Sequence, residues 1–365
     1  MYSGHAIRKP RFIRILTALP IMRVEFFFKA QSELSGLVNF MAGYQHTTAA
    51  SHLASKVQQS STSIFSRFNL ANKVKNDNLL ASAKNIISLM PVADVCVHYS
   101  LKYNTQRNVD QSFSYFNEFV SKAEDIGVRE VLVISGSGDK KALNTVSCLE
   151  MLRDSENCNT KVDIAVAFNP YFPDERNRTV EVARLNAKLA TGMVSVIYLQ
   201  FGSDIALLRE GLLAIQSALA SYEKSSAKSK RKSSKEIKVV GSVMIPSKVL
   251  LARMKFRPWN GVFLSPTFLS DVPTAESIVR EMLDTYRTFN VEPLVETAFK
   301  NNSDAAHILS LLSEDVCQPK RIEAVEIPIM PVKNIVPTDM FSTTAFPSLS
   351  QSMQVGAPKK RKGIH

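Results

Sequence analysis

The sequence has few cysteines and no long apolar run. Its 365 residues include only four cysteines, Cys96, Cys148, Cys158 and Cys317, without the spacing of a metal site or the density of a disulfide framework. No apolar run approaches the roughly 20 residues that a membrane helix needs. We therefore expect a soluble protein of a reducing compartment, with no membrane partner and no bound metal.

Acidic residues are missing from the first 23 positions, which contain five basic residues, the last of them Arg23. This composition is typical of a mitochondrial targeting segment. Serine is scarce there, however, and a basic lead into a first strand would look much the same. Residues 1–23 are therefore either a targeting segment or a basic N-terminal lead.

The formal net charge of +12 comes from 45 Lys and Arg residues against 33 Asp and Glu residues. Three segments hold more than this total: residues 1–23 carry five positive charges, residues 224–238 a net six, and residues 359–362 four. The remaining residues together therefore carry a net charge close to −3. A nucleic-acid-binding face on the folded core is therefore not indicated.

Two low-complexity segments account for much of the basic charge. Residues 224–236 are mostly Lys and Ser and cannot bury a core, so they predict a mobile basic insert. Residues 328–365 predict an extended tail, which ends in the basic cluster Lys359, Lys360, Arg361 and Lys362. Such a cluster is typical of a signal for a nuclear-import receptor, and a solvated charged tail explains it equally well.

Between these segments, short apolar runs alternate with amphipathic stretches. Strands are predicted at 24–29, weakly at 62–67, and at 93–99, 130–134, 162–168, 194–199, 239–246, 261–264 and 292–297. Helices are predicted at 31–45, 79–89, 112–125, 143–153, 180–190, 205–222 and 275–289. This rhythm is typical of parallel α/β folds, and a (β/α)₈ TIM-type barrel, which needs about 250 residues, fits residues 24–327.

The strand at 194–199 is followed by a polar side chain, Gln200. Gly192 ends the preceding helix, and Asp204 is placed to cap the next one. Because ligands of parallel barrels bind at the carboxyl ends of the strands, an amide at this position is a candidate ligand contact.

The order of these landmarks resembles the methylenetetrahydrofolate reductase family over residues 24–312. The matching stretches are Val24-Glu25-Phe26-Phe27, Val97-His98, Gly127 through Asp139, Lys188 with Gly192, Gln200-Phe201 with Asp204, and Val240-Gly241-Ser242-Val243-Met244 with Pro246. The family consists of flavin-dependent (β/α)₈ oxidoreductases. The resemblance implies FAD and NAD(P)H as cofactors and reduction of 5,10-methylenetetrahydrofolate to 5-methyltetrahydrofolate. It also implies a cytoplasmic protein of one-carbon metabolism and methionine biosynthesis, with a homo-oligomer as a candidate assembly.

The resemblance assigns roles to six residues. Glu25 would be the catalytic proton donor, Asp139 a catalytic carboxylate beside the flavin, and Gln200 the residue that binds the folate. The flavin would be held by His98, Glu181 and Lys188. Each also has a plainer interpretation: a solvated strand glutamate, a turn aspartate, a satisfied strand-end amide, a core histidine and two helix-surface charges.

The sequence departs from the family mainly on the flavin side. Residues 46–78 lack the Thr-Tyr-Gly-type turn, and the usual Arg-Gly-Asp is replaced by Ser135 through Asp139. The alternative hypothesis is therefore a flavin-depleted barrel that binds a folate or a protein partner, with a role in the nucleus. An unrelated barrel oxidoreductase of the luciferase-like kind is a third hypothesis, because this architecture supports many chemistries.

Overall fold

The computed structural model describes residues 22–26, 65–72, 74–75, 77–136, 142–228, 236–297, 307–308 and 310–311. Asp139, the predicted helix at 31–45, and the tail with its basic cluster lie outside the described residues. So does most of the N-terminal segment.

Eight parallel strands close into a barrel in the order of the sequence, β1 to β8. The strands are β1 (Met22–Phe26), β2 (Phe65–Leu70), β3 (Asp94–Ser100), β4 (Glu130–Ile134), β5 (Asp163–Phe168), β6 (Val196–Leu199), β7 (Lys238–Met244) and β8 (Glu292–Thr297). The predicted fold class, a (β/α)₈ TIM-type barrel, is confirmed.

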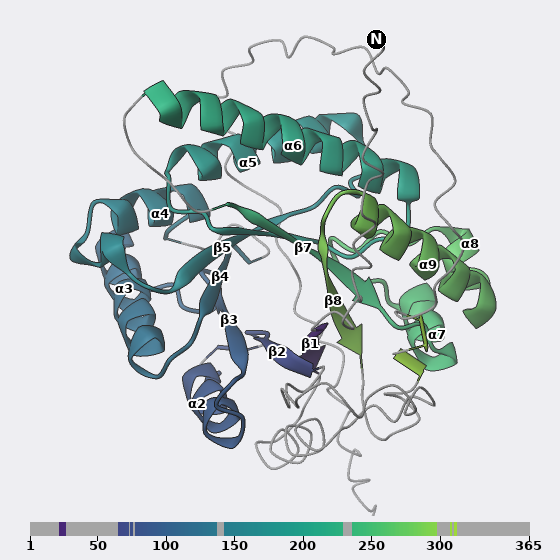
Figure 1. Ribbon diagram of the computed structural model, residues 1–365, viewed down its shortest axis with the longest axis horizontal. Helices are drawn as coiled ribbons and strands as arrows, with labels where there is room; N and C mark the ends of the chain where they lie inside the picture. Colours follow the sequence, from purple (N-terminus) through teal and green to yellow (C-terminus); the bar gives the residue numbers. More distant parts are fainter. Residues whose placement is uncertain are drawn as a thin grey trace, which may run out of the picture.

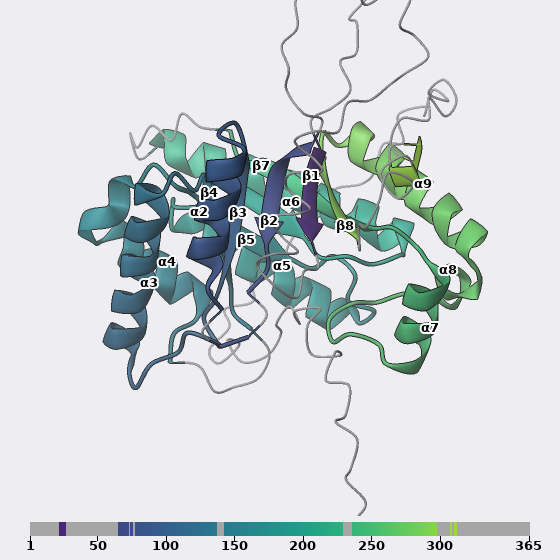
Figure 2. The ribbon, with the colours of Figure 1, turned by 90° about the horizontal axis from the view of Figure 1, so that it is seen from below.

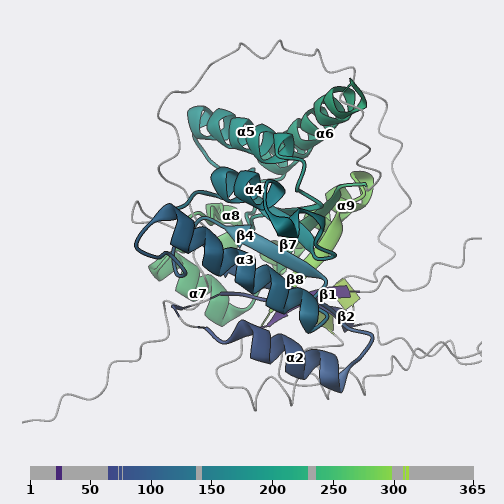
Figure 3. The ribbon, with the colours of Figure 1, turned by 90° about the vertical axis from the view of Figure 1, so that its left-hand side faces the viewer.

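The helices surround this barrel (Figure 1). They are α2 (Leu79–Leu89), α3 (Val109–Asp125), α4 (Thr145–Arg153), α5 (Glu175–Ala190), α6 (Ile205–Lys228), α7 (Lys248–Phe256), α8 (Pro266–Ser270) and α9 (Val272–Thr288). Figure 2 shows α3 and α4 on one side of the strands and α7 to α9 on the other. In Figure 3, α2 lies on the opposite side of the strands from α5 and α6.

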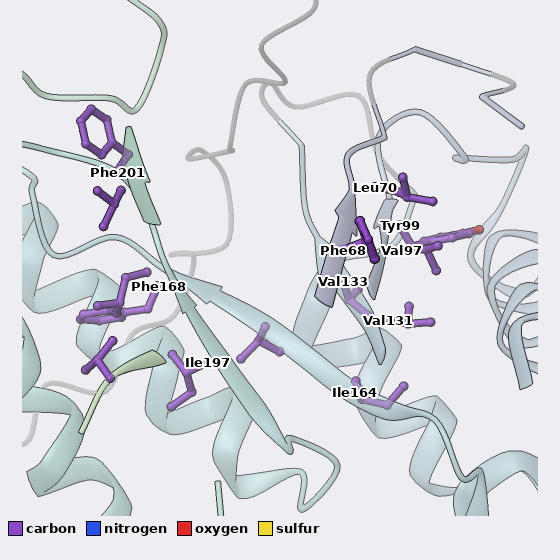
Figure 4. Close-up of a cluster of buried hydrophobic side chains, with 14 of the residues drawn as sticks. Phe68, Leu70, Val97, Tyr99, Val131, Val133, Ile164, Phe168, Ile197 and Phe201 are labelled. Atoms are coloured by element: carbon purple, nitrogen blue, oxygen red, sulfur yellow. The ribbon is translucent and has the colours of Figure 1, made fainter. Parts of the chain in front are cut away.

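The outer faces of the strands and the inner faces of the helices form the main apolar core. Successive side chains of a strand point to opposite sides, so Val97 and Tyr99 of β3 point toward the helices. The Tyr99 ring packs against Phe116 and Phe119 of α3, with ring centroids 5.0 and 4.9 Å away. Figure 4 shows part of this core, including Tyr99.

The alternate side chains fill the inside of the barrel. A small apolar cluster lies there, formed by Cys96, Leu132, Ile134, Ala165, Ala167, Val196, Tyr198, Val240 and Leu294. Gly241, on the outer face of β7, allows α9 to approach closely, because a Cβ there would lie 2.3 Å from Cζ of Tyr286.

A buried guanidinium, that of Arg23 on β1, lies inside the barrel and is 4 % exposed. It donates to Glu130 of β4 (Nη1–Oε1 3.3 Å), Tyr198 of β6 (Nη1–Oη 2.6 Å) and Glu292 of β8 (Nε–Oε1 3.0 Å). Tyr198 in turn donates to Glu130. The sequence groups Arg23 with the basic N-terminal residues, but in the structure it is a core residue that joins β1 to β4, β6 and β8.

Eight of the nine predicted strands correspond to barrel strands, with ends that differ by up to three residues, and one does not. Residues 261–264 do not form a barrel strand, and Phe263 makes only an isolated bridge to Gly202. The eight barrel positions are filled without it, because the weakly predicted strand at 62–67 is β2, shifted to Phe65–Leu70.

Among the described residues, the predicted helix at 79–89 is unchanged as α2, and the one at 143–153 is shorter as α4. The other predicted helices, now α3, α5, α6 and α9, are longer, and α7 and α8 are new. The prediction of a mobile insert at 224–236 was wrong for residues 224–228, which continue α6 to Lys228. Residues 229–235 are not described. Neither α7 nor α8 is predicted from the apolar spacing. Both begin at a serine, Ser247 or Ser265, whose side chain accepts from the backbone N–H three residues later.

Within the described ranges, no helix combines the length and apolarity needed to cross a membrane. The same ranges contain no group of three or more His, Cys, Asp or Glu side chains arranged for a metal ion.

Replacing Arg23 by alanine is expected to lower the free energy of unfolding by about 3–5 kcal/mol, because Glu130 and Glu292 would lose their buried partner. Arg129→Ala is the matched control, since that side chain is 76 % exposed and lies 3.8 Å from Asp94. Urea denaturation of both variants measures the difference. Equal losses would show that the buried cluster contributes no more than a surface pair.

Candidate functional site

The candidate site is the inner face of the barrel at the carboxyl ends of its strands, where enzymes of this fold place their active sites. We call it the mouth. Its polar side chains come from five strands and one strand end: Glu25, Asn69, His98, Ser242, Glu296 and Gln200.

Glu25 lies two residues after Arg23 and therefore points into the barrel. It is buried, with 6 % exposure, so the solvated-glutamate interpretation does not apply. Its Oε2 lies 3.7 Å from Nε2 of His98. This places two of the predicted residues side by side.

His98 is bound to a residue that the sequence analysis does not single out. The Asn69 amide nitrogen, on β2, lies 3.2 Å from His98 Nε2, and both side chains are buried. The Asn69 oxygen accepts from Arg23 at 3.3 Å. A continuous set of polar contacts therefore runs from Arg23 to Glu25.

A second carboxyl, Glu296 on β8, is the register partner of Glu25 on β1. In-register residues of parallel neighbours point to the same face, so both carboxyls lie on the inner side of the barrel. Burial raises the pKa of Glu296 to about 7, although a hydrogen bond from the Ser242 hydroxyl opposes the rise. Glu296 therefore gains and loses its proton near neutral pH.

Gln200 follows the last residue of β6 and lies two positions after Tyr198, whose hydroxyl contacts Arg23 inside the barrel. It is buried, and its Oε1 accepts from the backbone N–H of Phe201 at 3.2 Å. Glu25 and Gln200, the two residues on which the predicted site depends, thus lie on the same inner face at the carboxyl ends of β1 and β6.

Lys188 and Glu181 lie instead between α5 and the end of β5. Lys188 Nζ donates to the Ala167 carbonyl at 2.7 Å, and burial lowers the pKa of this amine while Glu181 opposes the fall. Glu181 accepts from the Asn169 backbone N–H at 3.2 Å and from Arg184 at 3.4 Å. Both charges are buried and hold the helix against the strand, so the surface-charge interpretation does not apply either.

These contacts bear on whether a flavin fits. A residue that binds a flavin phosphate or ribityl group must offer it a polar atom. The Lys188 amine is directed to a backbone carbonyl, and the Glu181 carboxylate is bonded on both oxygens. In this arrangement neither residue fits the predicted role, and Asp139 lies outside the described residues.

Two cavities are found away from the mouth. One of about 670 Å³ lies among the segments that follow β5, β6 and β7, and its polar lining includes Arg178, Asp204 and Ser265. The other, of about 950 Å³, lies at the amino-terminal side between α6 and α9. Of the predicted site residues, the five that the structure describes do not line either cavity.

Asn69, Ser242 and Glu296 are the mouth residues that sequence reasoning missed. Ser242 and Glu296 stand at inward positions of predicted strands, so strict alternation from Leu294 or Val240 would have identified them. Asn69 lies just beyond the weakly predicted strand at 62–67, so alternation along that strand did not reach it.

Comparisons with known proteins do not assign the chain to a family. No family model and no curated protein sequence matches the chain. Among solved structures, a 2,3-dimethylmalate lyase of the PEP mutase/isocitrate lyase superfamily is 12% identical, with a TM-score of 0.38, covering 80% of this chain and 89% of its own. The catalytic domain of a Pyrococcus furiosus chitinase is 8% identical, with a TM-score of 0.42 and coverages of 77% and 85%.

A third solved structure, a putative phosphonomutase from Burkholderia cenocepacia, is 11% identical, with a TM-score of 0.39 and coverages of 80% and 92%. Similarity at this level says nothing about substrate. The class of protein that the strand order defines is a (β/α)₈ barrel, with a buried polar site at its mouth.

Glu296→Gln should change how stability depends on pH. A carboxyl whose pKa is raised by folding stabilises the folded state below its unfolded pKa, and this contribution is lost as pH rises through the folded value. Relative to wild type, the variant should therefore gain on the order of 1–3 kcal/mol between about pH 5 and about pH 8.

Urea denaturation at the two pH values measures this gain. Glu150→Gln, on the exposed side of α4, is the control and should show none. A wild-type to Glu296→Gln difference that is the same at both pH values would contradict the raised pKa.

Proposed function

We propose that the chain is a barrel enzyme that binds a reduced folate at its mouth and uses Glu25 as a general acid. The observation that carries the proposal is the placement of buried Glu25 and the Gln200 amide on the same inner face. Resemblance to the reductase family supplies the substrate class, and the buried position of the carboxyl supplies the chemistry.

An acid is required because opening the five-membered ring that holds the one-carbon bridge leaves a nitrogen that takes up a proton. A buried carboxyl can hold that proton near neutral pH, since desolvation disfavours its charged form. Glu296 lies next to it in register and has its pKa raised to about 7. Two neighbouring carboxyls resist ionising together, which supports an acid role at this end of the barrel.

The Gln200 carboxamide supports folate binding. It offers a donor and an acceptor in one plane, which matches the paired hydrogen-bonding edge of a pterin. Its present acceptor contact is local, to the N–H of the next residue, so the side chain can exchange that contact for a ligand.

The full form of the proposal is reduction of 5,10-methylenetetrahydrofolate to 5-methyltetrahydrofolate with FAD and NAD(P)H. When bound, the flavin would supply the hydride. Because Lys188 and Glu181 do not fit a flavin as they stand, we derive no step that passes through it. Their engagement with the α5–β5 contact favours the second candidate, a barrel that binds a folate without flavin.

The absorption spectrum of the purified chain separates these two forms. A flavoprotein would be yellow, and NADH or NADPH would bleach its flavin band. The second candidate predicts a colourless protein that takes up no added FAD. That result would rule out flavin-dependent reduction and leave folate binding to be tested separately.

Folate binding is tested with two variants that separate binding from proton transfer. Gln200→Ala should weaken binding of 5,10-methylenetetrahydrofolate about tenfold, since one or two hydrogen bonds are lost. Glu25→Gln should leave this affinity within about threefold, and it should lower any turnover by at least about a hundredfold.

Isothermal titration calorimetry measures both affinities. Gln111→Ala, on the exposed side of α3, is the control. If the wild-type chain binds no reduced folate, the proposed function fails.

A further inference from the structure

The orientation of the Asn69 amide is fixed by its neighbours inside the barrel. A guanidinium carries only donors, and Arg23 Nη1 lies 3.3 Å from one polar atom of that amide. The atom must therefore be the oxygen, since a reversed amide would point its N–H₂ at the guanidinium. The Tyr198 hydroxyl, 3.5 Å from the same atom, is also compatible with an oxygen.

This orientation decides the protonation of His98. The Asn69 nitrogen, which can only donate, faces Nε2 of His98 at 3.2 Å. Nε2 must then accept, so the ring carries its proton on Nδ1 and is neutral. A doubly protonated imidazolium would bring two donors into contact.

The protonation of His98 decides whether its contact with Glu25 is an ion pair. The separation of 3.7 Å between Nε2 and Glu25 Oε2 would suit an ion pair if Nε2 carried a proton. With Nε2 accepting from Asn69, its one lone pair is occupied and it carries no proton. The histidine then neither donates to the carboxylate form of Glu25 nor takes its proton.

We propose that Asn69 is a positioning residue that holds His98 in its neutral Nδ1–H form and so keeps the mouth carboxyls as acids. The inference deepens the proposed function and rests on it for its meaning in catalysis. Its structural content stands without a folate.

The groups that face His98 come from several strands. Glu25 of β1 and Asn69 of β2 contact Nε2. The Tyr198 ring of β6 lies edge-on, with centroids 6.5 Å apart. Behind Asn69 lies Arg23, whose charge is balanced by its pairs with Glu130 and Glu292, so the hydrogen bond from Asn69 is what fixes the state of the ring.

Long-range ¹H–¹⁵N correlation spectra of the full chain, labelled on histidine nitrogen, test the proposal. The chain has six histidines. His98 is assigned by its absence from His98→Gln, or by substituting the other five in turn. The expected result is an Nδ1–H ring at neutral pH that takes up no second proton through the ordinary histidine range, near about pH 6.5.

Asn69→Asp reverses the hydrogen bond, because a carboxylate can only accept. In this variant His98 should carry a proton on Nε2, and the pH at which its ring becomes doubly protonated should rise by at least about one unit. Asn108→Asp makes the same change at the N-cap of α3 and should leave the His98 signals unaltered.

An Nε2–H ring or an imidazolium in the wild-type spectrum at neutral pH would overturn the proposal. The wild-type spectrum tests the proposal even if Asn69→Asp does not fold. Loss of the folate hypothesis would appear separately, as absence of folate binding by a chain whose His98 is still an Nδ1–H ring.

Discussion

A guanidinium inside a closed barrel must find partners for all its donors, because the surrounding strands exclude water. Arg23 meets this requirement by donating to Glu130, Tyr198, Glu292 and Asn69, which come from four other strands. Removing two charges from water costs several kcal/mol per ion, so such a cluster stabilises the fold only when its geometry is complete. Completeness here requires β1 to lie in register with both β2 and β8, and the β1–β8 pairing closes the barrel.

The same cluster extends toward the mouth. Asn69 accepts from Arg23 on one side and donates to His98 on the other, and His98 lies beside Glu25. The apolar side chains of the barrel interior occupy the remaining directions, so this polar path is narrow. The state of a titratable ring at one end of the barrel is thereby connected to a fixed charge deeper inside.

The sequence was sufficient for the barrel and for part of the site. Apolar runs and glycine stops located seven strands closely and β2 approximately, because buried parallel strands leave a clear signal. Glu25 and Gln200 were identified from the strand pattern, and alternation from Arg23 and Tyr198 puts both at inward positions. Helices α7 and α8 were missed because their apolar spacing is weak. The only sequence signal for each is the serine that caps its first turn.

Other residues could not be placed from sequence because their meaning depends on partners far along the chain. Arg23 looks like one more basic residue of the N-terminus until Glu130 and Glu292 are brought to it. Lys188 and Glu181 occupy the positions that a family resemblance assigns to flavin contacts, yet they bind the backbone at the end of β5.

In (β/α)₈ barrels the catalytic residues lie at the carboxyl ends of the strands, and residues important for stability lie at the amino ends. The two sets can therefore change independently as new reactions evolve. Here the two ends are linked, because the Asn69 side chain contacts both Arg23 and His98. Replacing the Arg23 cluster with tightly packed aliphatic side chains, a usual route to heat resistance, would also release the amide that orients the imidazole. Any lineage or laboratory selection for a tougher version of this protein would thus be expected to retain the arginine or to alter the reactivity.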